Sequence, residues 1–186
     1  MFTAVVPPLE VIEDINEYLR PRREAGLGEW RWTRPETWHV TTAFMADVPD
    51  HTTEELLDLL GEAATATPAF DLRLAGARFF PDVSRAHILA LDVPQCGDGG
   101  GHDHLAALAS RCRNAATRAG VEVDGARFTG HLTLGRARRR PGDATRWARV
   151  LDSFPGWGFT ADELVLVQSY LAERRHEVVG RWALAG

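Results

Sequence analysis

The tripeptide His-x-Thr occurs twice in this chain, each time within a stretch of apolar and β-branched residues. The first copy is His39 and Thr41 in ETWHVTTAF, and the second is His131 and Thr133 in FTGHLTLGR. Residues i and i+2 of a β-strand point to the same face of the sheet. We therefore expect each stretch to present one imidazole and one hydroxyl side by side.

Two imidazoles and two hydroxyls around one cleft suit the cleavage of a phosphodiester. In-line displacement at phosphorus needs a base at the attacking oxygen and an acid at the leaving oxygen, on opposite sides. Histidine can do either job near neutral pH, because its unperturbed pKa is about 6.5. Threonine hydroxyls can donate hydrogen bonds to the non-bridging oxygens, where charge accumulates. This chemistry needs neither a metal nor a cofactor, and we expect none.

Strand and helix signals alternate along the rest of the chain. They predict strands at 2–6, 30–33, 38–45, 70–79, 87–93, 121–123, 128–136, 163–171 and 177–184, and helices after Pro7-Pro8, after Thr52-Thr53, at 102–119 and at 143–154. The second half repeats the order of the first, with a His-x-Thr strand at a similar place in each. This predicts a single α+β domain over 1–186 with two lobes, pseudo-repeats near 1–80 and 81–186, and a central cleft.

Alternation along the motif strands also predicts their anchoring. Val40, Thr42 and Phe44 should share one face, opposite His39. Leu132 and Leu134 should share the corresponding face of the second strand. The predicted arrangement places both catalytic candidates on the open side of a packed sheet.

The composition is that of a globular protein, with 45% apolar and 25% charged residues. The formal net charge of −5 argues against a general binder of polyanions. All 21 basic residues are arginine, which excludes a lysyl-nucleotidyl intermediate, a Schiff base and a P-loop lysine. An arginine-rich segment near the second motif is either a confined phosphate-binding surface or a solvated face. It contains Arg127, Arg136, Arg138, Arg139, Arg140, Arg146 and Arg149, with one acid, Asp143.

The apolar runs, the first residues and the two cysteines predict a reduced, cytoplasmic protein without a membrane anchor. No apolar run reaches the length of a membrane span, and no basic region precedes the apolar start MFTAVVPPLEVIEDI. Cys96 and Cys112 do not suggest a disulfide framework. We expect a monomer, and we expect QCGDGGG at 95–101 to be a flexible loop.

Several other side chains are candidates for a function. His102, Asp103 and His104 could supply metal ligands, but they open a predicted helix, where Asp is favoured electrostatically. Trp32 could stack on a base. The remaining histidines, which have no partner pattern and are expected at the surface or in the core, are His51, His87 and His176.

The stretches WHVTTAF and GHLTLGR resemble the paired motifs of the 2H phosphoesterase superfamily. They are most similar to the RNA 2′,3′-cyclic phosphodiesterase group, also called 2′-5′ RNA ligase-like or LigT-like. FTAVVPP, WRWTRPETWHVTTAF, FDLRLAGARFFPD and ADELVLVQSYL also follow in the family order, so the resemblance covers nearly the whole chain. It implies metal-independent hydrolysis of 2′,3′-cyclic phosphates on RNA ends or nucleotides to 2′-phosphomonoesters, with 2′-5′ RNA ligation as the reverse reaction in vitro.

The resemblance also implies roles for the motif residues. His39 would be the general acid that protonates the 3′-oxygen, and His131 the general base that activates water. Thr41 and Thr133 would hold the phosphate, and Arg136 matches a family arginine that contributes to anion binding.

Two positions depart from the family pattern, and a third departs from strict strand alternation. The family often has a basic residue where Ala43 stands and proline where Gly130 stands. Strict alternation would put Arg136 on the face opposite His131, so its role requires the strand to end or bulge near Gly135. A non-catalytic RNA- or nucleotide-binding module that keeps the cleft is the alternative function, and turnover of a cyclic phosphate distinguishes the two.

Overall fold

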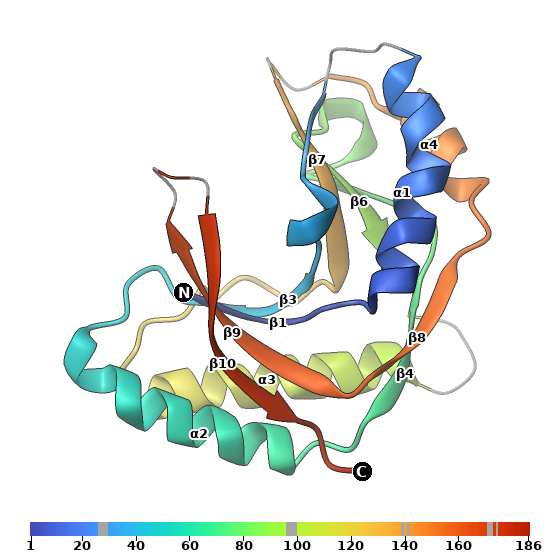
Figure 1. Cartoon of the computed structure of the whole chain (residues 1–186). Helices are drawn as coiled ribbons and strands as arrows, with labels where there is room; N and C mark the ends of the chain where they lie inside the picture. Colours follow the sequence, from blue (N-terminus) through green and yellow to red (C-terminus); the bar gives the residue numbers. More distant parts are fainter. Residues whose placement is uncertain (26–29, 96–99, 139, 141, 171–172, 174) are drawn as a thin grey trace.

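The computed structural model describes residues 1–25, 30–95, 100–138, 140, 142–170, 173 and 175–186 of the chain (Figure 1). Ten strands and four α-helices lie within these residues. The strands are β1 (Phe2–Val5), β2 (Trp30–Trp32), β3 (Val40–Phe44), β4 (Phe70–Leu74), β5 (Ala77–Phe80), β6 (Ile88–Asp92), β7 (His131–Ala137), β8 (Trp157–Ala161), β9 (Glu163–Tyr170) and β10 (Arg175–Ala183). The helices are α1 (Leu9–Glu24), α2 (Thr53–Thr65), α3 (Gly101–Arg118) and α4 (Thr145–Asp152), with short 3-10 turns η1 (Pro35–Thr37), η2 (Asp50–Thr52) and η3 (Val83–Arg85).

Eight strands form one antiparallel sheet in the order β10-β9-β1-β3-β7-β6-β5, with β2 paired to β7. The remaining strands, β4 and β8, pair with each other in a second, two-stranded sheet. In Figure 1, α2 and α3 lie side by side below the β1 and β9 part of the sheet, and α1 and α4 flank the β6 and β7 part. The fold is therefore α+β, with one pair of helices beside each of these two parts of the large sheet.

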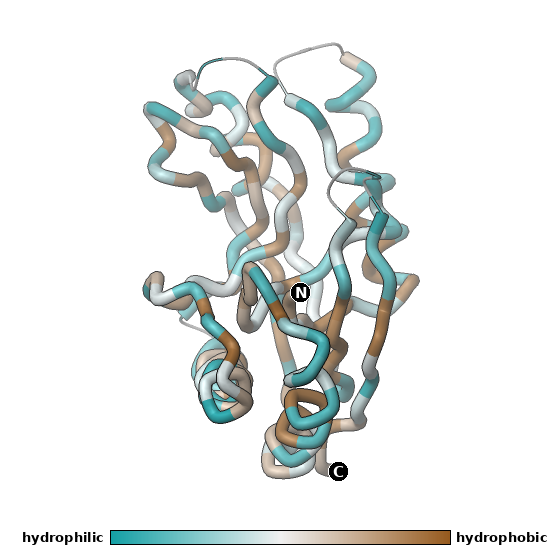
Figure 2. Tube along the Cα trace, turned by 90° about the vertical axis from the view of Figure 1, so that its left-hand side faces the viewer, coloured by the Kyte–Doolittle hydropathy of each residue, from teal (hydrophilic) through white to brown (hydrophobic). Residues whose placement is uncertain are grey.

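The helices form because their apolar residues recur on one face. Val11, Ile15 and Leu19 are the buried residues of α1, at spacings of four. A similar spacing appears in α3, where Leu105, Leu108 and Cys112 are fully buried. In Figure 2 hydrophobic and hydrophilic positions alternate along the helices and strands, as expected where each element buries one face.

The main core joins both halves, and a smaller apolar cluster lies apart from it. The smaller cluster consists of Phe2 and Ala4 of β1 with Val165 and Val167 of β9. Both faces of β9 are buried as a result, because Leu164 and Leu166 belong to the main core. The small cluster lies on the face of the sheet that carries the histidines, since Phe2 contacts a histidine ring as described below.

The order of elements repeats, which gives the fold its pseudo-two-fold character. With β2 and β10 left aside, the series β1, α1, β3, α2, β4, β5 is followed by β6, α3, β7, α4, β8, β9. Strand β1 pairs with β3, β6 pairs with β7, and the two halves meet where β3 pairs with β7. The predicted α+β class with a duplicated strand and helix order is therefore confirmed.

Several predicted elements differ from the structure. The predicted strand 70–79 is two strands in different sheets, because Gly76 with φ of 75° turns the chain between β4 and β5. Strand β8 is not among the predicted strands; it has only five residues, and Gly158 within it weakens the strand signal. The predicted strand 128–136 begins only at His131, and 121–123 forms a single bridge, from Val123 to Met45.

Three sequence features fall partly outside the described residues. Residues 96–99 of the predicted loop, including Cys96, and Arg139 of the arginine-rich segment are not described. Cys112 is buried, and burial raises the pKa of its thiol to about 11. None of the helices that the structure describes is long and apolar enough to cross a membrane.

Candidate active site

The two His-x-Thr motifs meet at the centre of the large sheet. Strands β3 and β7 pair in antiparallel orientation through Val40 and Leu132, the middle residues of the two motifs. Both middle residues are fully buried. Because neighbouring residues of a strand point to opposite faces, the four flanking motif residues share the other face. They are His39, Thr41, His131 and Thr133, and all four line one pocket.

A β-bulge follows each motif at the same place. Ala4 pairs with Thr41 but Thr3 pairs with Ala43, so Thr42 is the extra residue of β3. In the second half, Ala90 pairs with Thr133 and Leu89 with Gly135. The repeat thus extends to an irregularity of the backbone, which marks the two motifs as structural equivalents.

The second bulge decides the position of Arg136. Leu134 is the extra residue of β7, and both Leu134 and Gly135 are buried, so the alternation shifts by one position. Arg136 consequently lines the same pocket as His131. The bulge near Gly135 that its predicted role requires is therefore present.

The first bulge has the same effect on Phe44, which occupies the place that Arg136 has in the second half. Its side chain is 48% exposed, so the expectation that it packs with Val40 on the buried face is wrong. Strict alternation holds only in an unbroken strand, and Thr42 breaks it. Trp38, in contrast, is buried and donates its indole Nε1–H to Thr33 Oγ1 at 2.8 Å.

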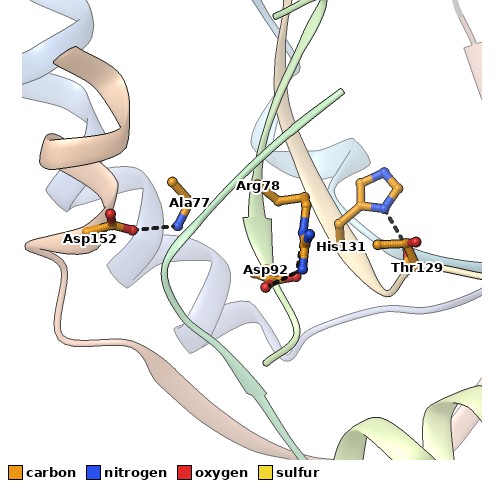
Figure 3. Close-up of polar contacts among 6 residues, drawn as sticks. All are labelled: Ala77, Arg78, Asp92, Thr129, His131 and Asp152. Atoms are coloured by element: carbon orange, nitrogen blue, oxygen red, sulfur yellow. Dashed lines mark hydrogen bonds and ion pairs between the residues drawn. The ribbon is translucent and has the colours of Figure 1, made fainter. Parts of the chain in front are cut away.

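Each catalytic candidate is held by the same backbone hydrogen bond. His39 Nδ1 lies 2.7 Å from the carbonyl oxygen of Thr37, and His131 Nδ1 lies 2.8 Å from that of Thr129 (Figure 3). A carbonyl oxygen can only accept, so Nδ1 must carry the proton in both rings. In the neutral state Nε2 is therefore the unprotonated nitrogen, available to accept or hold a second proton.

Aromatic rings support both imidazoles. Phe2 stacks on the His39 ring with 4.5 Å between centroids, and Phe80 packs against His131 at the same separation. His176 of β10 adds an edge contact of 6.0 Å to His39 and one of 5.4 Å to Phe2. The first histidine thus lies in an aromatic cluster that joins β1, β3 and β10.

Burial makes both histidines hard to protonate in the free protein. It lowers the pKa of His39 to about 4, and nearby positive charge on His176, His131 and Arg136 acts in the same direction. Burial is also the main cause that lowers the pKa of His131. The neutral imidazole is therefore the resting form of both near pH 7.

Among the residues that the structure describes, a charged pair lies beside the second histidine. Arg78 donates two hydrogen bonds to Asp92, at 3.0 and 2.7 Å, and Asp92 is the cross-strand partner of His131 (Figure 3). The carboxylate raises the pKa of His131, while the guanidinium of Arg78 lowers it. The net effect of this pair on His131 is partial cancellation.

The pocket between the two halves has a volume of about 970 Å³. Besides the motif residues, Arg31, Arg34, Arg136 and Trp32 line it from β2, η1 and β7. The β9 and β10 hairpin contributes another group that sequence patterns did not indicate, which includes Ser169, Tyr170, Glu173 and His176. These residues lie far from both motifs in sequence, so only the pairing of β9 with β1 brings them to the site.

The structure divides the arginine-rich segment. Of its described members, Arg136 lines the pocket, whereas Arg138 donates to the carbonyl oxygen of Trp30 at 3.2 Å and Arg146 and Arg149 belong to α4. The expected phosphate-binding surface is therefore not this segment as a whole. The other two arginines that line the pocket, Arg31 and Arg34, come from the first half of the chain.

Trp32 borders the pocket, but its ring is engaged elsewhere. It packs edge-on against Trp147 of α4 with 5.1 Å between centroids, and the guanidinium of Arg23 lies over it at 5.9 Å. Base stacking by Trp32 remains a prediction.

Gly130 has a packing reason to be glycine, because a Cβ there would lie 2.9 Å from Leu105 Cδ2.

The candidate metal ligands lie away from this pocket. His102 contacts Asp103 at 3.2 Å at the start of α3, and His104 stacks on Phe70. Among the residues that the structure describes, no three histidine, cysteine or acidic side chains gather as a metal site would require.

Comparisons with known proteins agree with this geometry. The model of the 2′-5′ RNA ligase superfamily matches residues 11–172. A protein of Geobacillus stearothermophilus named RNA 2′,3′-cyclic phosphodiesterase is 26% identical over 158 residues, covering 83% of this chain and 48% of that protein. One of the same name from Aquifex aeolicus is 25% identical over 109 residues, covering 58% of this chain and 55% of that protein. The chain spans about half the length of the curated relatives it matches.

Solved structures show the same fold. The crystal structure of E. coli LigT complexed with 3′-AMP superposes with a TM-score of 0.74 at 24% identity, covering 100% of this chain and 97% of the other. A crystal structure of a Thermus thermophilus protein gives a TM-score of 0.72 at 19% identity, with the same coverage. Since the family model extends over most of the chain and both His-x-Thr strands, the chain belongs to the 2′-5′ RNA ligase superfamily, and it has the fold of LigT.

Proposed function

We propose that this protein hydrolyses 2′,3′-cyclic phosphates at RNA ends or on nucleotides, leaving 2′-phosphomonoesters. The observation that carries the proposal is the meeting of the two His-x-Thr motifs around the Val40–Leu132 pair, which gives one pocket two imidazoles. An in-line displacement needs two proton-transfer groups on opposite sides of phosphorus, and a pair of facing motifs is suited to supply them.

The family resemblance gives the roles of the two rings in the proposed reaction, and the Nδ1 hydrogen bond of each ring leaves its Nε2 to transfer the proton. His131 accepts a proton from water through Nε2, and the water oxygen forms a new bond to phosphorus. The bond from phosphorus to the 3′-oxygen breaks, and His39 donates its Nε2 proton to that oxygen. The products are a 3′-hydroxyl and a 2′-phosphomonoester, and a proton has passed from water to His131 and from His39 to the product.

The other pocket groups act on the phosphate itself. Thr41 and Thr133 donate hydrogen bonds to the non-bridging oxygens, and Arg136 adds a positive charge on the same side. All of these groups come from one chain, so the proposed site needs no second copy. No lysine is available for a lysyl-adenylate, so any 2′-5′ ligation is the reversal of this same reaction.

The negative charge of the substrate stabilises the protonated form of His39 that the acid role requires. Burial keeps His39 neutral in the empty pocket, with its pKa lowered to about 4. A phosphodiester anion beside the ring favours the imidazolium and raises that pKa. Binding of the anion is therefore coupled to uptake of the catalytic proton.

The comparisons support the same activity. Two relatives carry the name RNA 2′,3′-cyclic phosphodiesterase, and the LigT structure that shares this fold is a complex with 3′-AMP. These relatives support a class of substrate, which is a nucleotide or RNA with a cyclic phosphate, rather than one particular RNA.

Product analysis with a 2′,3′-cyclic mononucleotide tests the proposal. We expect the 2′-phosphate and not the 3′-phosphate, undiminished turnover in excess EDTA, and loss of turnover in His39→Ala and His131→Ala. His51→Ala is the matched control, because His51 is exposed and does not line the pocket. Formation of the 3′-phosphate, or strict dependence on a divalent ion, would contradict the mechanism.

A non-catalytic module that binds RNA or nucleotides in the same pocket is the alternative. It is favoured if the folded wild-type protein turns over neither cyclic mononucleotides nor oligonucleotides with cyclic ends. Binding of a 2′-phosphate nucleotide, followed by calorimetry, would then identify the module, and His39→Ala would retain much of that affinity.

A further inference from the structure

Two arginines face each other across strands at one end of the pocket. Arg31 of β2 is the direct cross-strand partner of Arg136 of β7. Both residues are exposed and both line the pocket that holds the histidines. Like charges directly opposite each other in a sheet are destabilising, so the pairing has a cost in the empty protein.

No described carboxylate compensates this pair. Neither guanidinium forms an ion pair within the part of the chain that the structure describes. Glu173, the acidic residue among those that line the pocket, is paired with Arg175 at 3.2 Å. The two guanidinium groups are therefore open to an anion from outside the protein.

The backbone fixes the arginine pair relative to the motifs. Thr33 Oγ1 lies 2.8 Å from the carbonyl oxygens of both Thr133 and Leu134, and Thr33 N–H donates to Leu134 at 2.9 Å. This ties the end of β2 to the second His-x-Thr strand. Arg136 comes three residues after Thr133, which corresponds to about 10 Å along a strand, shortened here by the bulge.

The pocket has room beyond one reacting phosphate. Its volume of about 970 Å³ is at the upper end of the range of about 300–1,000 Å³ for sites that enclose drug-sized ligands. A positively charged groove that follows the backbone is the usual way to bind a single strand. Arg31 and Arg136 place positive charge beyond the motif residues, so they extend the site along the backbone of a bound strand.

We propose that Arg31, together with Arg136, forms a second phosphate subsite, which binds the phosphodiester on the 5′ side of the terminal nucleotide. This inference rests on the proposed function and names its substrate class: the ends of RNA chains rather than free cyclic mononucleotides. Arg136 reaches both the reacting phosphate and its neighbour, whereas Arg31 contacts only the neighbour.

The test compares two substrates with the same terminal base, a 2′,3′-cyclic mononucleotide and a dinucleotide ending in the cyclic phosphate. We expect the wild type to have a kcat/KM about tenfold or more higher for the dinucleotide, since a charged hydrogen bond has that worth. Arg31→Gln should bring the ratio of the two values close to one. Arg31→Lys should restore part of it, because lysine keeps the charge but not the bidentate geometry.

Two controls separate a local contact from a general charge effect. Arg111→Gln on the exposed surface of α3 removes the same charge outside the pocket and should keep the wild-type ratio. Added salt should lower the wild-type ratio more than that of Arg31→Gln, because phosphate contacts are screened. Thermal unfolding verifies that each variant is folded.

The outcomes distinguish this inference from the proposed function. Equal ratios in the wild type and Arg31→Gln, or an equal loss with both substrates, would overturn the second subsite while leaving the hydrolysis intact. If neither substrate is turned over, the proposed function fails, and the subsite is tested by binding. Arg31→Gln should then weaken a dinucleotide with a terminal 2′-phosphate about tenfold more than the mononucleotide, since the same charged contact is lost, and an equal effect on both would overturn it.

Discussion

The half-site of His39 and the half-site of His131 have the same backbone but different surroundings. In each, a His-x-Thr triplet is followed by a bulge, the imidazole is hydrogen-bonded to the carbonyl two residues before it, and a phenylalanine packs on the ring. These shared features fix the positions of the Nε2 atoms. They do not decide which ring holds a proton more readily.

The surroundings of the two rings differ. His39 lies beside the apolar cluster of Phe2 and Ala4 and against His176, with no described carboxylate among the causes of its pKa shift. His131 lies beside the Arg78–Asp92 pair, in which the guanidinium lowers its pKa and the carboxylate raises it. Duplication of a strand thus supplies the geometry for two proton-transfer groups, and the unlike neighbours allow the two groups to differ in function.

Removing either imidazole has the largest expected effect. His39→Ala and His131→Ala should each reduce kcat by about 10²–10⁴-fold, the usual contribution of general acid or base catalysis. A cyclic substrate with sulfur in place of the 3′-oxygen breaks the symmetry, because a thiolate leaves without a proton. It should restore turnover in His39→Ala but not in His131→Ala. Rescue of the other variant would reverse the two roles.

Removing either hydroxyl should have a smaller and more equal effect. Thr41→Val and Thr133→Val keep the shape of the side chain and remove the donor to a non-bridging oxygen. We expect each to reduce kcat by about 10²-fold, as for one donor of an oxyanion site. A difference of more than about tenfold between the two variants would show that only one half-site holds the phosphate.

The pH profile should depend on whether substrate is bound. The base must be neutral and the acid protonated, so the rate follows a bell-shaped curve. Both pKa values are lowered in the free protein, so the maximum of kcat/KM should lie below pH 6.5. The bound anion raises both values, so the kcat profile should lie at higher pH. Flat profiles between about pH 5 and 8 would contradict paired histidine catalysis.

The depressed pKa of His39 also predicts the pH dependence of folding. Its pKa is about 4 in the folded state and about 6.5 when unfolded, so the unfolded chain binds more protons between these values. Stability from this group is fully present above about pH 6.5 and falls as the pH drops toward 4. Urea unfolding at about pH 7 and pH 5 should show the wild type losing about 2 kcal/mol more than His39→Gln. Equal losses would place the ring in water.

The smallest expected effect concerns Asp92. Asp92→Asn removes the charge that raises the pKa of His131, so that pKa should fall further and the limb of kcat/KM that reports His131 should move to lower pH. Imidazole NMR titration should show the change at His131, while the His39 signal serves as the internal reference. An equal change at both rings would mean that the variant altered the pocket as a whole.

Much of the site could be predicted from the sequence because its chemistry is local. Residues i and i+2 of a strand share a face whatever the strand pairs with, so His39 and Thr41 can be placed together from their spacing alone. The same local rule predicts that Arg136 needs a bulge near Gly135. It fails for Phe44, because the bulge at Thr42 depends on pairing with β1 and leaves no clear signal in the sequence.

Other parts of the site depend on contacts between distant segments. His176 has no motif around it and reaches the pocket only through the pairing of β10 with β9 and of β9 with β1. The predicted strand 70–79 is divided between two sheets for a related reason. The turn at Gly76 separates the two strands, and the pairing of β4 with β8 and of β5 with β6 places them in different sheets.

The sequence by itself determined the candidate reactive groups, the shared face of the histidine and threonine within each motif, and the resemblance to the family, because these follow from residue types at fixed spacing. Only the tertiary structure decided that Val40 pairs with Leu132 and that Arg31 faces Arg136. Strand register is set by the packing of the whole sheet and by its bulges, and shifting it by one residue moves every side chain to the other face. The pocket residues therefore lie on one face only because the strands pair in this register.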